Sequence, residues 1–168
     1  MSTTKFREMR RKNQVLPENI TMEVLERGSN GILSVIGDDG YPYGVPVSYA
    51  MLDGKIYFHC AKTGHKIDAI TNCDKVCFTV VDKDEIVPEK FTTFFRSVIV
   101  FGKAKILTEK EEILAAIRAI SGKYSPDETV ESRENEIKGS FNAMAIVEIT
   151  PEHISGKEAI ELVKMRKM

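Results

Sequence analysis

Residues 37–60, GDDGYPYGVPVSYAMLDGKIYFHC, decide the fold that the sequence predicts. The opening GDDG and the later pair Asp53-Gly54 are turn sequences of the kind that joins neighbouring antiparallel strands. Between these turns, residues 41–51 alternate large and small side chains, which is the period of a strand with two unlike faces. Residues 55–60 form the next strand, so the stretch predicts consecutive β-hairpins.

The flanking sequence adds strands and places short helices between them. Further strands are expected at 31–36, 75–82, 91–107 (with Gly102 as a bulge) and 143–149, and a charged loop is expected at 83–90. Helices are expected at 17–27 with Gly28 closing the end, at 65–72, from a Thr108/Glu111 capping box to near Gly122, and from residues 125–128 onward. Because hairpins dominate and no βαβ alternation occurs, these elements predict a mostly β protein: an antiparallel barrel with peripheral helices.

The chain of 168 residues is expected to form a single domain, 1–168. Residues 1–16 carry a cluster of basic side chains and little apolar periodicity, so we expect a basic N-terminal arm that frays or lies across a partner subunit. Residues 157–168 are expected to form a C-terminal helical tail.

The charge balance and composition exclude several classes of function. The 24 basic and 25 acidic side chains nearly cancel, which argues against a nucleic-acid binder that uses its whole surface. The sequence has neither a membrane-spanning apolar run nor a secretory signal, so we expect no membrane partner and a cytoplasmic location. The three cysteines follow no disulfide pattern and are interpreted as small apolar residues in a reducing compartment.

Residues 59–68, HCAKTGHKID, are a candidate anion site. They predict a strand end, a glycine turn and a helix that begins with His65 and Lys66. Cationic side chains are unfavourable at the positive end of a helix unless a negative group lies there, and a phosphate would supply one. The alternative is that both side chains are simply solvated.

The small face of residues 41–51 is a second candidate surface. Pro42, Gly44, Pro46, Ser48 and Ala50 leave room for a flat group against the backbone, and the prolines place part of the strand at a sheet edge. The alternative is a helix packed on a smooth sheet face. A ligand with a planar ring and a phosphate tail would span this face and the neighbouring anion site.

Two other groups of residues bear on the chemistry. Arg96 lies beside Ser97 in an apolar run, so its guanidinium must reach water, a carboxylate or a ligand anion. His59, Cys60, His65, Cys73 and Cys77 match no zinc spacing, and no metal site is expected. Serine hydrolase, Walker A and dinucleotide-binding glycine motifs are also missing from the sequence.

The stretches 37–49, 55–66 and 95–102 carry a family resemblance. In order and spacing they resemble the 5-nitroimidazole reductase (Nim-type) branch of the pyridoxamine 5′-phosphate oxidase-like flavoproteins, and the likeness runs from about Met9 to Lys157. It implies a split β-barrel and a homodimer that binds FMN between its subunits.

The resemblance also implies positions for the site residues. It places Val47, Ser48 and Tyr49 along the flavin ring, His59, Cys60 and Ala61 along the ring edge or ribityl chain, Lys62, His65 and Lys66 near the phosphate, and Arg96 and Ser97 where the subunits meet.

The activity that follows is an FMN-dependent reduction of a flat, electron-poor acceptor such as a nitroimidazole. NADH or NADPH is the candidate electron donor, and the proton comes from His59 or from water. Two alternatives remain: a flavin-binding or flavin-storage protein without turnover, and a haem-binding split barrel in which His59 or His65 coordinates iron.

Overall fold

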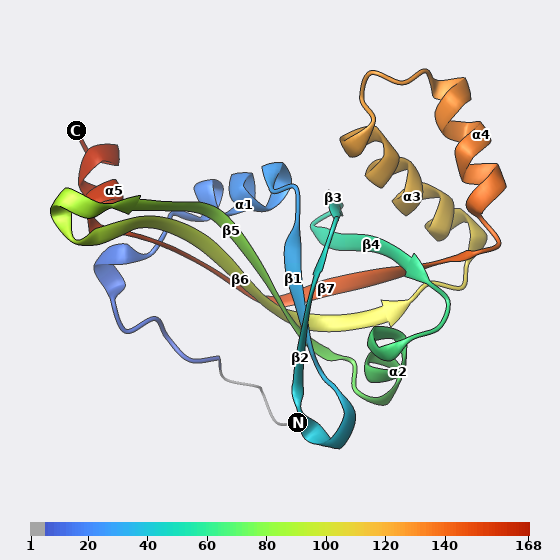
Figure 1. The fold of residues 1–168 in the computed structure, drawn as a ribbon, viewed down its shortest axis with the longest axis horizontal. Helices are drawn as coiled ribbons and strands as arrows, with labels where there is room; N and C mark the ends of the chain where they lie inside the picture. The colour runs from blue at the N-terminus through green and yellow to red at the C-terminus, as the bar shows by residue number, and fades with distance from the viewer. Residues whose placement is uncertain (1–5) are drawn as a thin grey trace.

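The computed structural model describes residues 6–168 as a seven-stranded antiparallel sheet, curled into a half-barrel with helices around it (Figure 1). The strands lie in the order β2-β1-β5-β6-β7-β4-β3. They are β1 (Gly31–Ile36), β2 (Pro42–Val47), β3 (Ala50–Leu52), β4 (Lys55–Ala61), β5 (Lys75–Val87), β6 (Thr92–Ile106) and β7 (Met144–Glu158). The helices are α1 (Glu18–Arg27), α2 (His65–Asn72), α3 (Lys110–Tyr124), α4 (Val130–Ser140) and α5 (Ile160–Arg166), and short 3₁₀ turns are η1 (Lys12–Gln14), η2 (Asp38–Gly40) and η3 (Pro88–Lys90). The predicted class, mostly β and antiparallel with peripheral helices, is confirmed.

The predicted turns form where the Asp-Gly pairs stand. Asp39 and Gly40 have φ values of 55° and 77° between β1 and β2, and Asp53 and Gly54 have 50° and 74° between β3 and β4. Aspartate and glycine are the residues that tolerate this left-handed conformation best. Local turn chemistry therefore sets both hairpins.

The strand predicted over residues 41–51 is interrupted at Ser48 and Tyr49. β2 pairs only with β1, and β3 pairs only with β4, so the chain crosses here from one sheet edge to the other. The Tyr124 hydroxyl accepts from the Tyr49 amide at 2.8 Å and donates to the Tyr49 carbonyl at 2.9 Å. The break is therefore stabilised by a residue of α3 that is distant in sequence. β2 lies at one edge of the sheet, which confirms the predicted edge position.

The prediction of a charged loop at 83–90 is wrong. After a bulge between Val81 and Lys83, β5 continues to Val87, which pairs with Thr92 at the start of β6. This two-stranded extension, residues 83–95, is called the hairpin arm below. It extends from the half-barrel beside α5 (Figure 1), and Val87 and Phe94 pack against Ala159 and Leu162. Apolar burial against the C-terminal segment thus outweighs the charge of the arm.

The C-terminal boundaries also differ from expectation. β7 runs to Glu158 rather than ending at Ile149, and the tail helix begins at Ile160 rather than at residue 157. The strand is longer because it pairs with β6 along most of its length, from Ile106↔Val147 to Arg96↔Glu158. A bulge beside Gly102 interrupts this pairing, as predicted.

The two helices before β7 begin at other residues than predicted. The capping box is wrong, since α3 has Glu109 at its N-cap without a side-chain hydrogen bond, and the helix continues through Gly122 to Tyr124. α4 begins at Val130 rather than at 125–128, because the Thr129 hydroxyl caps it by accepting from the Ser132 amide at 3.1 Å.

The main core fills the concave side of the sheet under α1 and α2, around Phe58 and Phe78. Gly28 ends α1 as predicted, but with an ordinary φ of −57°. Glycine is needed there for space, because a Cβ would lie 2.5 Å from the Tyr49 hydroxyl oxygen.

The predicted N-terminal arm, residues 1–16, packs on its own sheet where it is described. Val15 bridges to Lys157, and buried Leu16 donates its amide to the Gly156 carbonyl at 2.9 Å. The Phe6 ring stacks on His153 at 4.9 Å. Residues 6–16 therefore do not form a fraying arm, and residues 1–5 lie outside the described part of the chain.

Candidate functional site

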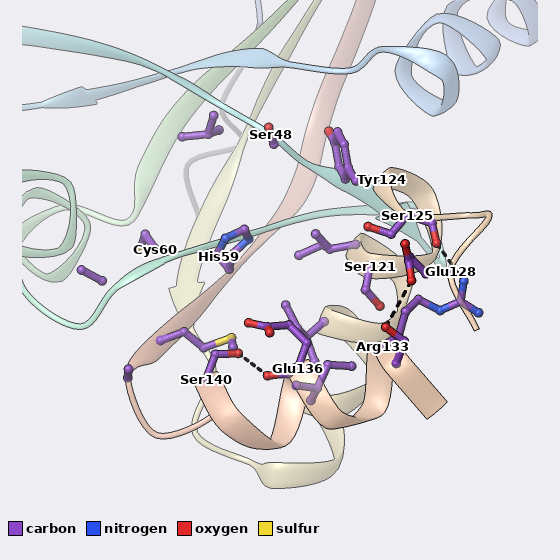
Figure 2. A pocket seen from close by; sticks show the side chains of 18 of the residues that line it. Ser48, His59, Cys60, Ser121, Tyr124, Ser125, Glu128, Arg133, Glu136 and Ser140 are labelled. Carbon is purple, nitrogen blue, oxygen red and sulfur yellow. Dashed lines mark hydrogen bonds between the residues drawn. The ribbon is translucent and has the colours of Figure 1, made fainter. Parts of the chain in front are cut away.

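A cavity of about 1040 Å³ opens between the strands β2 and β4 on one side and the helices α3 and α4 on the other (Figure 2). Its strand side is lined by residues 45–48 and 59–61, and Lys66 of α2 also lines it. The cavity therefore brings Pro46 and Ser48 of the predicted small face together with Lys66 of the candidate anion site, whereas Pro42, Gly44 and Ala50 are not part of its lining.

Six of the predicted site residues line this cavity: Val47, Ser48, His59, Cys60, Ala61 and Lys66. Ser48 stands at the strand break, and Figure 2 shows His59 and Cys60 beside each other on β4. Lys62, Tyr49, His65, Arg96 and Ser97 are not part of its lining.

Lys66 is placed by an unusual backbone turn. Gly64, before α2, has φ of 128° and ψ of 170°, a conformation open essentially only to glycine. Within the described residues, the Lys66 ammonium makes no ion pair. Burial raises the pKa of the neighbouring Cys60 thiol, although the Lys66 charge acts in the opposite direction. Lys66 and the Cys60 thiol therefore lie near each other in the cavity lining.

His65 is engaged outside the cavity. Its ring stacks on Tyr43 at 4.1 Å, and its Nε2 lies 3.4 Å from the Asp38 amide that donates to it. The Asp38 carboxylate lies 3.8 Å from the same nitrogen. These contacts hold the β1–β2 turn against α2, so the structure assigns a packing role to His65. Lys66 is then the cationic side chain on the strand side of the cavity, and Arg133 is one on its helical wall.

Tyr49 points into the core, where its hydroxyl donates to the Leu25 carbonyl at 2.5 Å. Its pKa is raised by burial and by the nearby Tyr124 and Asp82. The Tyr49 side chain therefore belongs to the core and does not line the cavity.

Arg96 binds carboxylates of its own chain. Its guanidinium lies 3.2 Å from Asp82 and 3.1 Å from Glu158, which is fully buried. Burial raises the pKa of Asp82, but the hydrogen bonds and charges of Arg27 and Arg96 outweigh it and lower that pKa overall. Of the three partners considered for Arg96, which were water, a carboxylate and a ligand anion, the single chain therefore supplies carboxylates.

The helical wall of the cavity was not predicted from the sequence. It carries Ser121, Tyr124, Ser125, Glu128, Ser132, Arg133, Glu136 and Ser140. Glu128 accepts from the Ser132 hydroxyl at 3.2 Å, and Arg133 donates to the Ser125 carbonyl at 2.9 Å. Figure 2 shows Glu136 extending from α4 into the cavity toward His59. The polar residues recur at helical spacing, but in sequence such a stripe cannot be told from a solvated helix face.

The side of the sheet that faces away from the main core is partly apolar, and the N-terminal segment covers part of it, with Phe6 stacked on Phe101 at 5.5 Å. Ile32 of β1, Val81 of β5, and Ile99 and Phe101 of β6 are exposed there, Val81 to 57%. Strand pairing places Ile32 and Ile99 on either side of Thr79, so these side chains form a continuous patch, called the outer face below. Ser97 and Ile99 also line a second cavity between this face and the N-terminal segment. Contiguous exposed apolar surface is typical of interaction sites.

Within residues 6–168, no cluster of three or more candidate metal ligands is found. The same residues contain no helix that is long and apolar enough to cross a membrane.

The fold and the site together define a class: a split-barrel protein with a ligand-sized cavity beside the edge strand of the half-barrel. The family model for pyridoxamine 5′-phosphate oxidase matches residues 17–158, and the chain belongs to that family. The comparison with curated proteins finds no match.

Several solved structures share the fold. A candidate 5-nitroimidazole antibiotic resistance protein from Bacteroides thetaiotaomicron is 19% identical with a TM-score of 0.72, covering 86% of each chain. The flavocytochrome Anf3 from Azotobacter vinelandii is 16% identical with a TM-score of 0.71, covering 90% of this chain and 72% of its own. An FAD-binding protein from Mesorhizobium loti is 24% identical with a TM-score of 0.59, covering 87% and 97%.

Proposed function

We propose that the protein is an FMN-dependent oxidoreductase that reduces a flat, electron-poor acceptor. The observation that carries the proposal is one cavity that joins Pro46 and Ser48, at the end of the edge strand β2, to Lys66 at the start of α2. Lys66 makes no ion pair with any of residues 6–168. A planar ring with a phosphate at its end matches both parts. The names of the Anf3 and Mesorhizobium neighbours, which state flavin binding, support the same class of cofactor.

In this arrangement Pro46 to Ser48 support one face of the flavin ring, and Lys66 with the free amides at the start of α2 neutralises the phosphate. Bound flavin supplies the hydride that the protein itself cannot provide. His59 stands on the cavity wall, where it can donate a proton to the reduced acceptor. Cys60 and Ala61 line the remaining length of the site.

The acceptor is proposed to lie between the flavin and the α3–α4 wall. Nitroaromatic compounds such as nitroimidazoles are the first acceptors to test, because they are flat and electron-poor, and because the Bacteroides neighbour is named for resistance to them. NADH or NADPH is the proposed electron donor.

The functional unit is proposed to be a homodimer formed through the outer face. The exposed Ile99 and Phe101 lie beside Ser97 and Arg96 on β6, the positions that the family resemblance places at the subunit contact. Burying this face would remove apolar surface from water.

The proposal is tested by titrating the purified protein with FMN and with riboflavin while flavin fluorescence is followed. We expect Lys66→Ala to weaken FMN by about 10- to 100-fold, because a charge-assisted contact contributes about 1.5–3 kcal/mol, and to leave riboflavin nearly unchanged. Lys75→Ala, on the exposed start of β5, is the matched control with the same loss of charge.

Absence of FMN binding at micromolar concentration by the unmodified protein would refute the proposal, and equal losses for both ligands would show that the phosphate lies elsewhere. Stopped-flow reduction by NADH or NADPH, followed by a nitroaromatic acceptor, separates an enzyme from a flavin-storage protein. A Soret band after addition of haem would instead support the haem-binding alternative.

A further inference from the structure

Phe91, at the tip of the hairpin arm, combines a strained backbone with a fully exposed ring. Its φ and ψ of 49° and 42° are left-handed, and its side chain is 98% exposed. The other non-glycine residues with positive φ among those described are Asp39 and Asp53, a type that tolerates this conformation. A bulky residue there is a genuine outlier, and such strain is typical of sites where the side chain has a function.

The hairpin arm holds this ring in a defined position. Its strands stay paired to Val87↔Thr92, and the Ala159 amide donates to the Phe95 carbonyl at 2.8 Å. At its base, buried Glu158 binds Arg96 of β6 at 3.1 Å and Arg166 of α5 at 2.8 Å. The tip is therefore a stiff projection that carries an aromatic side chain into solvent.

The hairpin arm and the cavity lie at opposite ends of the molecule. Figure 1 shows the arm with α5 at one end of the long axis and the helices α3 and α4, which form the cavity wall, at the other. The outer face lies between them, and β6 runs directly from this face into the arm. A two-fold axis through the outer face would make the contacts reciprocal, so each arm could reach the cavity end of the partner.

We propose that Phe91 of each chain seats in the mouth of the second copy's cavity and closes it over the bound flavin. This inference rests on the proposed function for the ligand and for the dimer. Half-buried Met144 lines the cavity, and the buried side chains of Ile117 and Ile120 form apolar wall beneath it, so the ring would meet apolar surroundings there. The exposed ring would gain burial there, and water would be excluded from the cavity.

A cross-linking experiment tests the contact without any flavin. Phe91→Cys is introduced into the chain with Cys73→Ser and Cys77→Ser, which leaves Cys60 in the cavity as the only other thiol. A short bismaleimide should then give a covalent dimer on a denaturing gel, and the further change Cys60→Ser should abolish it. Lack of a covalent dimer, or its persistence without Cys60, would overturn the proposal.

A second measurement separates a structural role from closure of the cavity. Phe91→Gly removes the ring and suits the positive φ, so the far-UV circular dichroism spectrum of the folded protein should not change. We expect FMN affinity to fall by about tenfold as the apolar contact is lost. Ile86→Ala, also on the arm and 75% exposed, is the control and should bind FMN normally.

If Phe91→Gly binds FMN with normal affinity, the proposal that Phe91 closes the cavity is overturned. The two proposals fail differently. If the Phe91→Cys variant forms the cross-linked dimer but the unmodified protein binds no FMN, the proposed function is contradicted. If the unmodified protein binds FMN but the Phe91→Cys variant forms no cross-link to Cys60, this inference is contradicted.

Discussion

Glu148 of β7 is a buried carboxylate that binds side chains of both neighbouring strands, β4 and β6. It accepts from the Tyr57 hydroxyl at 2.8 Å and lies 3.1 Å from Lys55 and 3.5 Å from Lys105. Burial raises the pKa of Glu148, but the hydrogen bonds from Tyr57 and Lys55 and the lysine charges outweigh it, so that pKa is lowered overall. Tyr57 belongs to β4, the strand that presents His59 and Cys60 to the cavity.

The lowered pKa predicts the pH dependence of Glu148→Gln. Because the folded-state pKa lies below the unfolded value, the carboxylate stabilises the fold at neutral pH, and this contribution is lost as pH falls through the folded-state pKa. We expect the variant to lose about 1–3 kcal/mol at neutral pH and to approach the unmodified protein once the pH has fallen below the lowered folded-state pKa.

Urea unfolding at neutral and acidic pH measures this difference. Glu134→Gln, which removes a carboxylate paired with Arg118 on the exposed surface of α3 and α4, is the control and should change stability less. A difference between Glu148→Gln and the unmodified protein that stays constant with pH would contradict the assignment.

Among the individual residues, the sequence predicted some of those that line the cavity, but it could not show which others are held by the rest of the protein. Lys66, Ser48 and His59 were found because their segments have a definite local pattern: a helix start, a small strand face and a strand end. From the sequence alone, His65 and Arg96 could not be distinguished from residues that contact a ligand. The residues that they contact in the structure, Tyr43 and Glu158, are distant in sequence.

At the scale of the elements, local chemistry predicts turns and tertiary contacts decide lengths. The Asp-Gly hairpins and the bounds of α2 followed from residues within each segment. The strand break at Ser48 depends on Tyr124, and the length of the hairpin arm depends on Leu162 of α5. Such partners lie many residues away, so propensity and periodicity could not reveal them.

Two glycines at helix positions should respond oppositely to alanine. In Gly28→Ala the new Cβ would lie 2.5 Å from the Tyr49 hydroxyl and 2.8 Å from Val80 Cγ1, so we expect a loss of about 1–3 kcal/mol. In Gly122→Ala, inside α3, the Cβ meets nothing within 4 Å, so we expect a gain of up to about 1 kcal/mol.

The midpoints of urea unfolding of the two variants give the comparison. The same sign of change in both would contradict the interpretation that Gly28 is required for space.

At the scale of the whole molecule, the outer face predicts the assembly. Ile99→Lys places a charge in the middle of this apolar patch, and we expect a monomer in sedimentation and weaker FMN binding. Val130→Lys, at the exposed start of α4, is the control and should leave the assembly unchanged. A dimer that persists in Ile99→Lys would show that the chains associate elsewhere.

The antiparallel fold was predictable because its hairpins are local, whereas the cavity wall required the placement of α3 and α4 relative to β4. Polar residues such as Ser132 and Glu136 can be recognised as cavity residues only once that placement is known. The family match over residues 17–158 confirms the fold-level expectation.

The central claim is that one cavity holds the ring and the phosphate of FMN. The decisive experiment is a crystal structure of the protein grown with FMN. We expect density for the ring against Pro46 to Ser48 and for the phosphate within hydrogen-bonding distance of Lys66. Flavin bound at another surface, or with its phosphate pointing away from Lys66, would contradict it.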